Sequence, residues 1–384
     1  MGLNPARSSG GWDSGSRGSL DALENEEDTI TFSYSYATLT PQSPTKKGSI
    51  PAERPVKLQQ KSAGGGGMQF NPGSGWQEAV TSVRDLDKWI EDLDYIAGWS
   101  LAHRGAMDSQ MLRAWRLPAD AEVEEAVVIC REDPARWLRL VSFKGVAQTQ
   151  IRSSGQPWET GGLFSILLYS ADTQAAFQRA QERWWSAHHD PVVMEFGGRE
   201  LLNVVLRGPD GCNFGLYQPL KPTPAEPFPF LKAGPPFTGQ QMVRNKEKTE
   251  RFYADALGWN SWFSGTISLS CNNFGIPDNM VGVNPKHVAI AHATEGEYGQ
   301  VELVQWTGFE GQHYGDKAVP PNLGHLALRW PVDDLANQVA TIRAAGIDLF
   351  VEPTTVTLPP LGEVLLCTIR TPDGVMIELI QTTG

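Results

Sequence analysis

The sequence predicts an α+β protein made of four copies of one strand–helix–strands unit, preceded by a disordered N-terminal tail. Two observations predict the units. After Trp76 the chain repeats one order four times: an alternating strand, a polar residue that opens an amphipathic helix, a glycine near the helix end, and further strands. The closing strands of the four copies also have similar sequences, which are RWLRLVSF, NFGLYQP, QVELVQW and MIELIQ.

Residues 1–67 form the tail. They are rich in Ser, Gly, Pro, Thr and Gln, and they finish in the run KSAGGGG before Met68. Such a composition cannot bury enough apolar surface to offset the entropy that is lost when a chain is ordered. We therefore expect residues 1–67 to be disordered, with the glycine run as a flexible joint.

Each unit carries the signals of one helix. A polar side chain before the first turn accepts a hydrogen bond from a free backbone N–H, and a glycine tolerates the left-handed conformation that ends a helix. The expected N-caps are Asp85, Asp172, Asn245 and Asp334. The expected terminating glycines are Gly98, Gly258 and Gly346.

The spacing of the units indicates a duplicated pair. One place on the opening strands holds Glu78, Ser165, Thr238 and His325, and the first two lie 87 residues apart, as do the last two. One place on the closing strands holds Arg139, Gly215, Glu302 and Glu378, where the first and third lie 163 residues apart, as do the second and fourth. We therefore expect two tandem domains, 68–220 and 237–384, joined by a Pro-rich linker at 221–236.

Charge and cysteine content narrow the class of function. The 384 residues carry a formal net charge of -12 and no basic run beyond Lys46-Lys47, which argues against a nucleic-acid partner. Four cysteines without a Cys-x-x-Cys pair indicate neither a zinc knuckle nor a disulfide framework. No apolar run approaches the roughly 20 residues that span a bilayer, and the N-terminus lacks the apolar core of a signal peptide. We expect a cytoplasmic protein that acts on a small molecule and binds no membrane.

Three ionisable side chains stand on strands of the second half. Because a strand alternates its faces, Glu302 in VELVQ, Glu378 in MIELIQ and His325 in HLALRW point away from their apolar neighbours. If the third and fourth units curl into one half-barrel, two carboxylates and one imidazole converge in a single cup. Burial of such carboxylates without a partner is very costly, and a divalent cation is the simplest compensation.

The phrases GHLALRW, ERFYADALG and TPDGVMIELIQ, together with the βαβββ order, resemble the vicinal oxygen chelate superfamily, which includes glyoxalase I, extradiol ring-cleaving dioxygenases and bleomycin resistance proteins. The resemblance covers about residues 76–384. It implies two tandem glyoxalase-like half-barrel domains, which pair within the chain or in a homodimer. It also implies one divalent metal ion, for which Zn, Ni, Co, Mn and Fe(II) all remain open. The implied ligands are Glu302, His325 and Glu378, with Gln240 as a substitute for Thr238, which departs from the family pattern.

The first half is expected to bind no metal. Its matching places hold Glu78, Arg139, Ser165 and Gly215, which is one good ligand and a cation where an anion is needed. We interpret this half as a scaffold or substrate wall that has lost its ion.

The leading hypothesis for the second half is an isomerase or lyase. Its metal would hold two neighbouring oxygens of a small organic substrate and stabilise an enolate or oxyanion. The likeness to glyoxalase I implies Glu302 or Glu378 as general base, with a slight preference for Glu378. Trp306, His313 and Tyr314 are expected near the substrate. The alternatives are an Fe(II) ring-cleaving dioxygenase and a protein that only sequesters a ligand.

Overall fold

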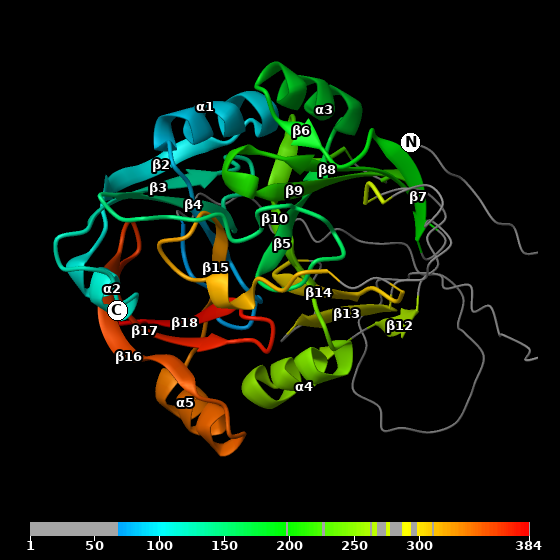
Figure 1. Ribbon diagram of the computed structural model, residues 1–384. Coiled ribbons are helices and arrows are strands. Elements are labelled where there is room, and N and C mark those ends of the chain that lie inside the picture. The colour runs from blue at the N-terminus through cyan, green and yellow to red at the C-terminus, as the bar shows by residue number, and fades with distance from the viewer. Residues whose placement is uncertain are drawn as a thin grey trace, which may run out of the picture.

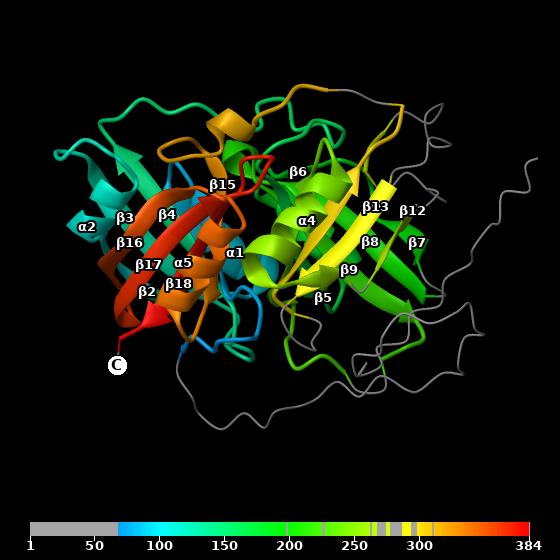
Figure 2. The same cartoon turned by 90° about the horizontal axis from the view of Figure 1, so that it is seen from below.

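The computed structural model describes residues 68–196, 199–224, 227–261, 263–266, 274–276, 286–292, 298–308 and 311–383, and the expected tail lies outside these ranges. Two curled sheets lie side by side (Figure 2). Helices α1 (Leu86–Ala97) and α3 (Thr173–Glu182) lie together on one side of the sheet pair, and α4 (Lys246–Leu257) and α5 (Leu335–Ala344) lie on the opposite side (Figure 1). The described ranges also contain the short helix α2 (Ser109–Ala114) and two 3-10 turns, Pro209–Gly211 and Gly315–Lys317.

All four predicted N-caps are confirmed. In each helix the side chain of the capping residue accepts a hydrogen bond from the backbone N–H three residues later, and the capping residues are Asp85, Asp172, Asn245 and Asp334. Gly98 and Gly258 adopt the left-handed conformation after α1 and α4, as expected of stop residues. The helix predictions hold because caps act within one turn of chain and need no tertiary partner.

The two sheets take their strands from both halves of the sequence. The eight-stranded sheet has the order β16 (Leu349–Leu358), β17 (Gly362–Arg370), β18 (Met376–Thr382), β15 (Gly324–Pro331), β1 (Glu78–Ser82), β4 (Trp137–Lys144), β3 (Glu122–Ile129) and β2 (Ser100–Ala106). The ten-stranded sheet contains β11 (Asn260–Ser261), β13 (Lys286–His292), β14 (Gln300–Gln305), β10 (Ala233–Met242), β5 (Leu163–Ser170), β9 (Asn213–Lys221), β8 (Arg199–Arg207) and β6 (Ser186–Ala187), with β12 (Ser264–Thr266) beside β13 and β7 (Val192–Phe196) beside β8.

The expectation that the third and fourth units share one half-barrel is wrong. The first unit pairs with the fourth through antiparallel β1 and β15, and the second pairs with the third through antiparallel β5 and β10. The two tandem halves at 68–220 and 237–384 are therefore not the sheet units, although β9 ends and β10 begins within the expected linker. The reason is that each opening strand finds its antiparallel partner in the other half.

The faces of the two sheets have different partners. One apolar core contains residues of α1, α3, α4 and α5 together with residues of both sheets, so the helix-side faces share it. The opposite face of each sheet curls into a cup. A second apolar cluster lines the cup of the eight-stranded sheet, and a third lines that of the ten-stranded sheet.

Two expectations about composition can be compared with the fold. Cys130, Cys212 and Cys367 are buried free thiols, whereas Cys271 lies outside the described residues. Burial raises the pKa of the Cys130 thiol to about 12, so this cysteine stays protonated and unreactive at neutral pH. Among the described helices, none has the length and apolar content to cross a bilayer.

Candidate functional site

One pairing recurs at the same place in both cups. In the eight-stranded sheet, Arg329 on β15 lies opposite Glu378 on β18 and opposite Glu78 on β1. In the ten-stranded sheet, Gln240 on β10 lies opposite Glu302 on β14 and opposite Ser165 on β5. The matching register makes the two cups versions of one site with different side chains: a guanidinium between two carboxylates in the first, and an amide between a hydroxyl and a carboxylate in the second.

The cup of the eight-stranded sheet holds a buried ion network. Arg329 Nε lies 2.6 Å from Glu378 Oε2, and its Nη1 lies 3.3 Å from Glu78 Oε1. The Arg139 guanidinium binds Glu78 as well, and its Nη1 lies 2.9 Å from Glu125 Oε2. The exposed fraction of each of these five side chains is 1% or less. The strand neighbours of the charged residues, including Ala79, Leu138, Leu328 and Leu379, belong to the helix-side core, so alternation places the charged residues on the cup face.

The charges in this network stabilise one another. Burial by itself would raise the pKa of Glu78, but Arg139 and Arg329 outweigh it and hold that pKa below its usual value. Burial disfavours the charged form of Arg329, yet the carboxylates of Glu378 and Glu78 raise its pKa overall. Glu78 and Arg329 therefore stay ionised at neutral pH because their oppositely charged neighbours lie inside the same cup.

Both carboxylate oxygens of Glu378 accept a hydrogen bond within the protein. Its Oε2 accepts from Arg329, and its Oε1 accepts a hydrogen bond of 2.8 Å from Trp115 Nε1. A positive guanidinium next to the carboxylate also repels a second cation. The predicted roles of Glu378 as metal ligand and base therefore do not fit its surroundings.

His325 lies on the other face of β15, and its predicted place beside Glu378 is wrong. A register shift between Val80 and Thr81 brings His325 opposite Thr81, which alternates away from Glu78 and the cup. His325 Nδ1 lies 2.9 Å from Thr81 Oγ1, and Nε2 lies 2.9 Å from the carbonyl oxygen of Asn213. Because a carbonyl only accepts, Nε2 carries the hydrogen and Nδ1 accepts from the hydroxyl. Both ring nitrogens are therefore occupied within the protein.

The shift also explains why spacing selected the wrong residue. In each unit the residue that we selected on the closing strand pairs with a residue on the opening strand. In the first three units that pairing residue lies two positions after the residue that we selected on the opening strand, as Gln240 lies two positions after Thr238. In the fourth unit the partner of Glu378 is Arg329, so the corresponding place is Ala327 and not His325. The equivalent of Gln240 is thus Arg329.

The cup of the ten-stranded sheet holds a chain of hydrogen bonds. Ser165 Oγ donates to Gln240 Oε1 at 3.0 Å, and Gln240 Nε2 donates to Glu302 Oε2 at 2.9 Å. Ser165 and Gln240 are buried, whereas Glu302 is half-buried. Unlike Glu378, Glu302 is a carboxylate with partial access to solvent, and a neutral amide fixes one of its oxygens.

Tyr217 on β9 belongs to this cup, and the sequence analysis missed it. Burial raises the pKa of its phenol well above the usual value, and the charge of Glu302 raises it further. The hydroxyl is therefore a neutral hydrogen-bond donor near the carboxylate at physiological pH. Its position two residues after Gly215 on the same strand face is the signal that could have identified it.

Apolar side chains line the rest of the cup. Trp306 follows Glu302 by four residues and packs in the third apolar cluster with Phe274, whose ring centroid lies 5.3 Å away. The other buried members are Phe164, Val205, Met242, Ile276 and Val304. Trp306 thus stands in the wall of the cup that holds Glu302, and its contact with a substrate stays a prediction.

His313 and Tyr314 serve a contact between two loops. His313 Nδ1 lies 2.9 Å from Thr160 Oγ1, and Tyr314, which is buried, donates a hydrogen bond of 3.0 Å to Glu159 Oε1. Arg152 lies under the same contact and donates to the carbonyl oxygen of Glu159. These partners give both residues a structural role, and their predicted place at a substrate entrance gains no support.

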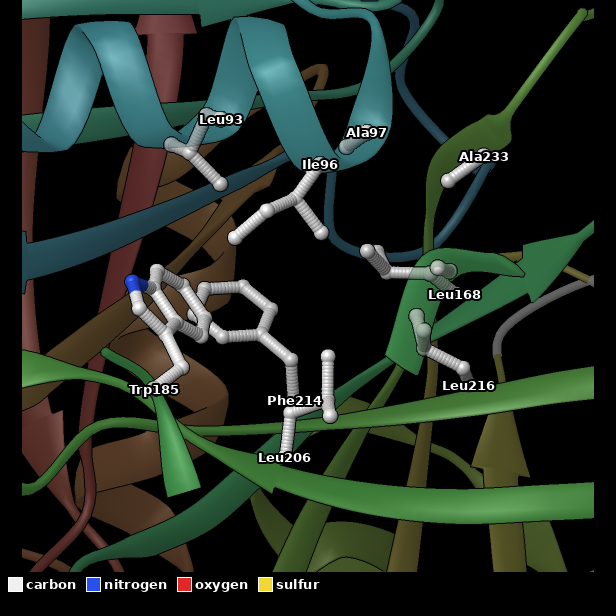
Figure 3. Close-up of a pocket in the computed structure, with 10 residues that line it drawn as sticks. Leu93, Ile96, Ala97, Leu168, Trp185, Leu206, Phe214, Leu216 and Ala233 are labelled. Carbon is white, nitrogen blue, oxygen red and sulfur yellow. The ribbon is translucent and has the colours of Figure 1, made fainter. Parts of the chain in front are cut away.

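A small cavity lies away from both cups. Its volume is about 10 Å³, and it lies next to α1 on the helix side of the ten-stranded sheet (Figure 3). Every residue in its lining is apolar, including Ile96, Trp185 and Phe214. A space of this size accommodates at most one water molecule, and no polar group is present to bind it. We therefore interpret the cavity as a packing gap and not as a ligand site.

The expected metal can now be tested against the donors in each cup. Within the described ranges, no three His, Cys, Asp or Glu residues are grouped as metal ligands. The eight-stranded cup does not fit a cation, because guanidinium groups occupy its carboxylates. In the ten-stranded cup, Glu302 supplies a carboxylate, and Gln240 on the adjacent strand presents its Nε2 to it while its Oε1 accepts from Ser165. With the amide turned over, Gln240 Oε1 and the Glu302 carboxylate form an oxygen-only pair that fits a weakly held hard cation whose shell is completed by water.

Comparison with solved structures shows which known proteins share this fold. No protein-family model and no curated protein matches the sequence. Glyoxalase I from Zea mays is 17% identical, with 80% of this chain and 92% of that chain covered and a TM-score of 0.54. A proposed dioxygenase from Bacillus subtilis is 10% identical, with 82% of this chain and 86% of that chain covered and a TM-score of 0.50. At such identities the likeness shows the fold and transfers no reaction.

Proposed function

Because the chain has the fold of the vicinal oxygen chelate superfamily, we propose that it is a glyoxalase-like enzyme whose reaction takes place in the cup of the ten-stranded sheet. The proposed reaction is proton transfer at a carbon next to a carbonyl group of a small organic substrate, as in an isomerase or lyase. One observation carries this proposal: Glu302 is half-buried and held by a neutral amide, whereas Glu378 at the matching place is closed off by an arginine.

Each side chain of the cup has a chemical task in this proposal. Glu302 accepts the proton from the substrate carbon, because its carboxylate is the accessible base. Gln240 fixes the orientation of that carboxylate through its Nε2, and Ser165 fixes the amide in turn. Tyr217 donates a hydrogen bond to the oxygen on which negative charge develops, since its phenol stays protonated. The apolar wall around Trp306 excludes water from the reacting atoms.

A divalent cation in this cup would be held by the Glu302 carboxylate, and by Gln240 Oε1 once the amide has turned over, because Nε2 faces Glu302 and Oε1 accepts from Ser165 when no cation is bound. When bound, it would polarise the substrate carbonyl and lower the cost of the enolate. Oxygen donors favour Mn²⁺ over the softer ions among those considered for this fold.

The test is a pair of matched carboxamide variants. Purified wild type, Glu302→Gln and Glu378→Gln are screened against 2-oxo-thioesters, hemithioacetals and catechols, with metal content measured by elemental analysis. Loss of the base is expected to lower kcat of Glu302→Gln by roughly 10²–10⁴-fold, whereas Glu378→Gln keeps kcat within about threefold. Equal kcat in wild type and Glu302→Gln would refute the role of Glu302.

A gain of charge tests the same cup from the other direction. Gln240→Arg copies the arrangement of Arg329 and Glu378, so the new guanidinium is expected to pair with Glu302 and abolish turnover. Gln240→Met, which has a similar length and no charge, is the control and should retain part of the activity. If ligand binding occurs without turnover in every substrate class, and Glu302→Gln leaves that binding unchanged, the protein is a ligand-sequestering protein and the enzymatic proposal fails.

A further inference from the structure

We propose that the cup of the eight-stranded sheet is closed by an ion lock, made of Glu78, Glu125, Arg139, Arg329 and Glu378, in which Arg329 occupies the place of a cation. This cup then binds neither a metal nor a substrate, and only one of the two cups is functional. The ion lock stands on the geometry of this cup, and only the statement that the other cup is functional rests on the proposed function.

The first support is the internal comparison between the cups. Arg329 and Gln240 have the same two strand partners, one on the closing strand of their own unit and one on the opening strand of the paired unit. At that shared place one cup has a neutral amide and the other has a guanidinium. The guanidinium of Arg329 therefore places a permanent positive charge between the facing carboxylates of Glu78 and Glu378.

The second support is complete burial. All five members of the ion lock have exposed fractions of 1% or less, and their three carboxylates and two guanidiniums leave a formal charge of -1. Ionised groups persist in such a place only when they are paired with one another. An arginine cannot give up its proton under physiological conditions, so the positive charge is permanent.

The third support is the cover above the network. Trp115 of the segment after α2 donates to Glu378, and Arg139 Nη2 donates to the carbonyl oxygen of Pro359 at 2.8 Å. Trp137, Val141 and Met376 alternate with the charged residues on the same strands and belong to the apolar cluster of this cup. A substrate would have to displace both the hydrogen bonds and this apolar layer.

The decisive variant is Arg329→Gln, which gives this cup the amide found at Gln240. Removal of the guanidinium leaves Glu78 and Glu378 facing each other, and the melting temperature is expected to fall by roughly 5–10 °C without added metal. Addition of MnCl₂ should restore a large part of that fall, because the new amide and two carboxylates form an oxygen site for a divalent ion. The double variant Arg329→Gln/Glu378→Gln should show no such restoration, and Arg343→Ala, which breaks an exposed ion pair with Glu352, should change little.

Two results would overturn the ion lock. One is Arg329→Gln protein that melts like the wild type and is not stabilised by MnCl₂. The other is a wild type that contains bound metal which Glu378→Gln loses, since Glu378 would then be a ligand. The second measurement decides the matter if Arg329→Gln does not fold. Neither result bears on Glu302, so failure of the ion lock and failure of the proposed reaction are distinguishable.

Discussion

At the scale of single residues, the chemistry of each cup depends on the side chain between two facing strand partners. Gln240 pairs the carboxylate of Glu302 with a neutral amide, whereas Arg329 pairs Glu378 and Glu78 with a positive charge. Alternation along the strands correctly predicted that Glu302 and Glu378 point away from the helix-side core. It could not predict their different partners, because those come from strands far away in the sequence.

His325 shows a second consequence of burial at this scale. Burial lowers the pKa of His325 to about 4, and burial lowers that of His188 to about 4 as well. In the unfolded chain both titrate near pH 6.5, so between about pH 6.5 and 4 the unfolded state binds more protons than the folded one. The free energy of unfolding is therefore highest above pH 6.5 and falls as the pH is lowered through this window.

We expect urea titrations at pH 7.5 and pH 5.0 to show this loss. Each histidine is expected to contribute a decrease of about 2 kcal/mol at most between these two pH values. In His325→Asn the decrease should be about half that of the wild type, because only His188 then titrates in a buried place. The same pH dependence in both proteins would show that His325 takes no part in it.

At the scale of elements, the helices follow from local sequence and the strand irregularities do not. Asn245 and Asp85 were identified as caps because the signal lies within four residues. The register shift on β15 that turns His325 away from the cup has no such local signal. A bulge is set by how two strands pair, and β15 and β1 are more than 200 residues apart in the sequence.

The cap of α4 gives a test at this scale. Asn245 accepts a hydrogen bond of 2.8 Å from the backbone N–H of Lys248. Asn245→Ala is expected to lower the free energy of unfolding by about 1 kcal/mol, because the N–H loses its partner at the helix end. The exposed residue Arg251 on the same helix serves as control, and Arg251→Ala should change the stability by less than about 0.5 kcal/mol in chemical denaturation. Equal losses in both variants would argue against a capping effect.

At the scale of the whole molecule, the two halves of the sequence are interlocked. Each sheet joins one unit of the first half to one unit of the second, through β1 with β15 and through β5 with β10. The apolar core between the helices also contains residues from both halves. The predicted duplication is therefore a repeat in the sequence. The two units that share one sheet come from different halves of the chain.

This arrangement predicts how the separated halves behave. Residues 68–224 and 227–383, produced as two chains, should each expose the edges of β1 and β5 or of β15 and β10. Each alone is expected to aggregate or self-associate, whereas coexpression should yield a folded one-to-one complex. Size-exclusion chromatography with light scattering and circular dichroism would check this. A folded monomer from either half would contradict the interlocked arrangement.

The sequence by itself determined the four units, their helix ends, the cup-facing alternation of Glu302 and Glu378, and the class of fold, because these depend on neighbours within one element or on a repeated pattern. The tertiary structure decided which units share a sheet, and with that it placed Arg329 between Glu78 and Glu378 and left Glu302 with Gln240. Electrostatic partners are chosen by distance in space, so the same carboxylate on the same kind of strand is a candidate base in one cup and part of an ion lock in the other.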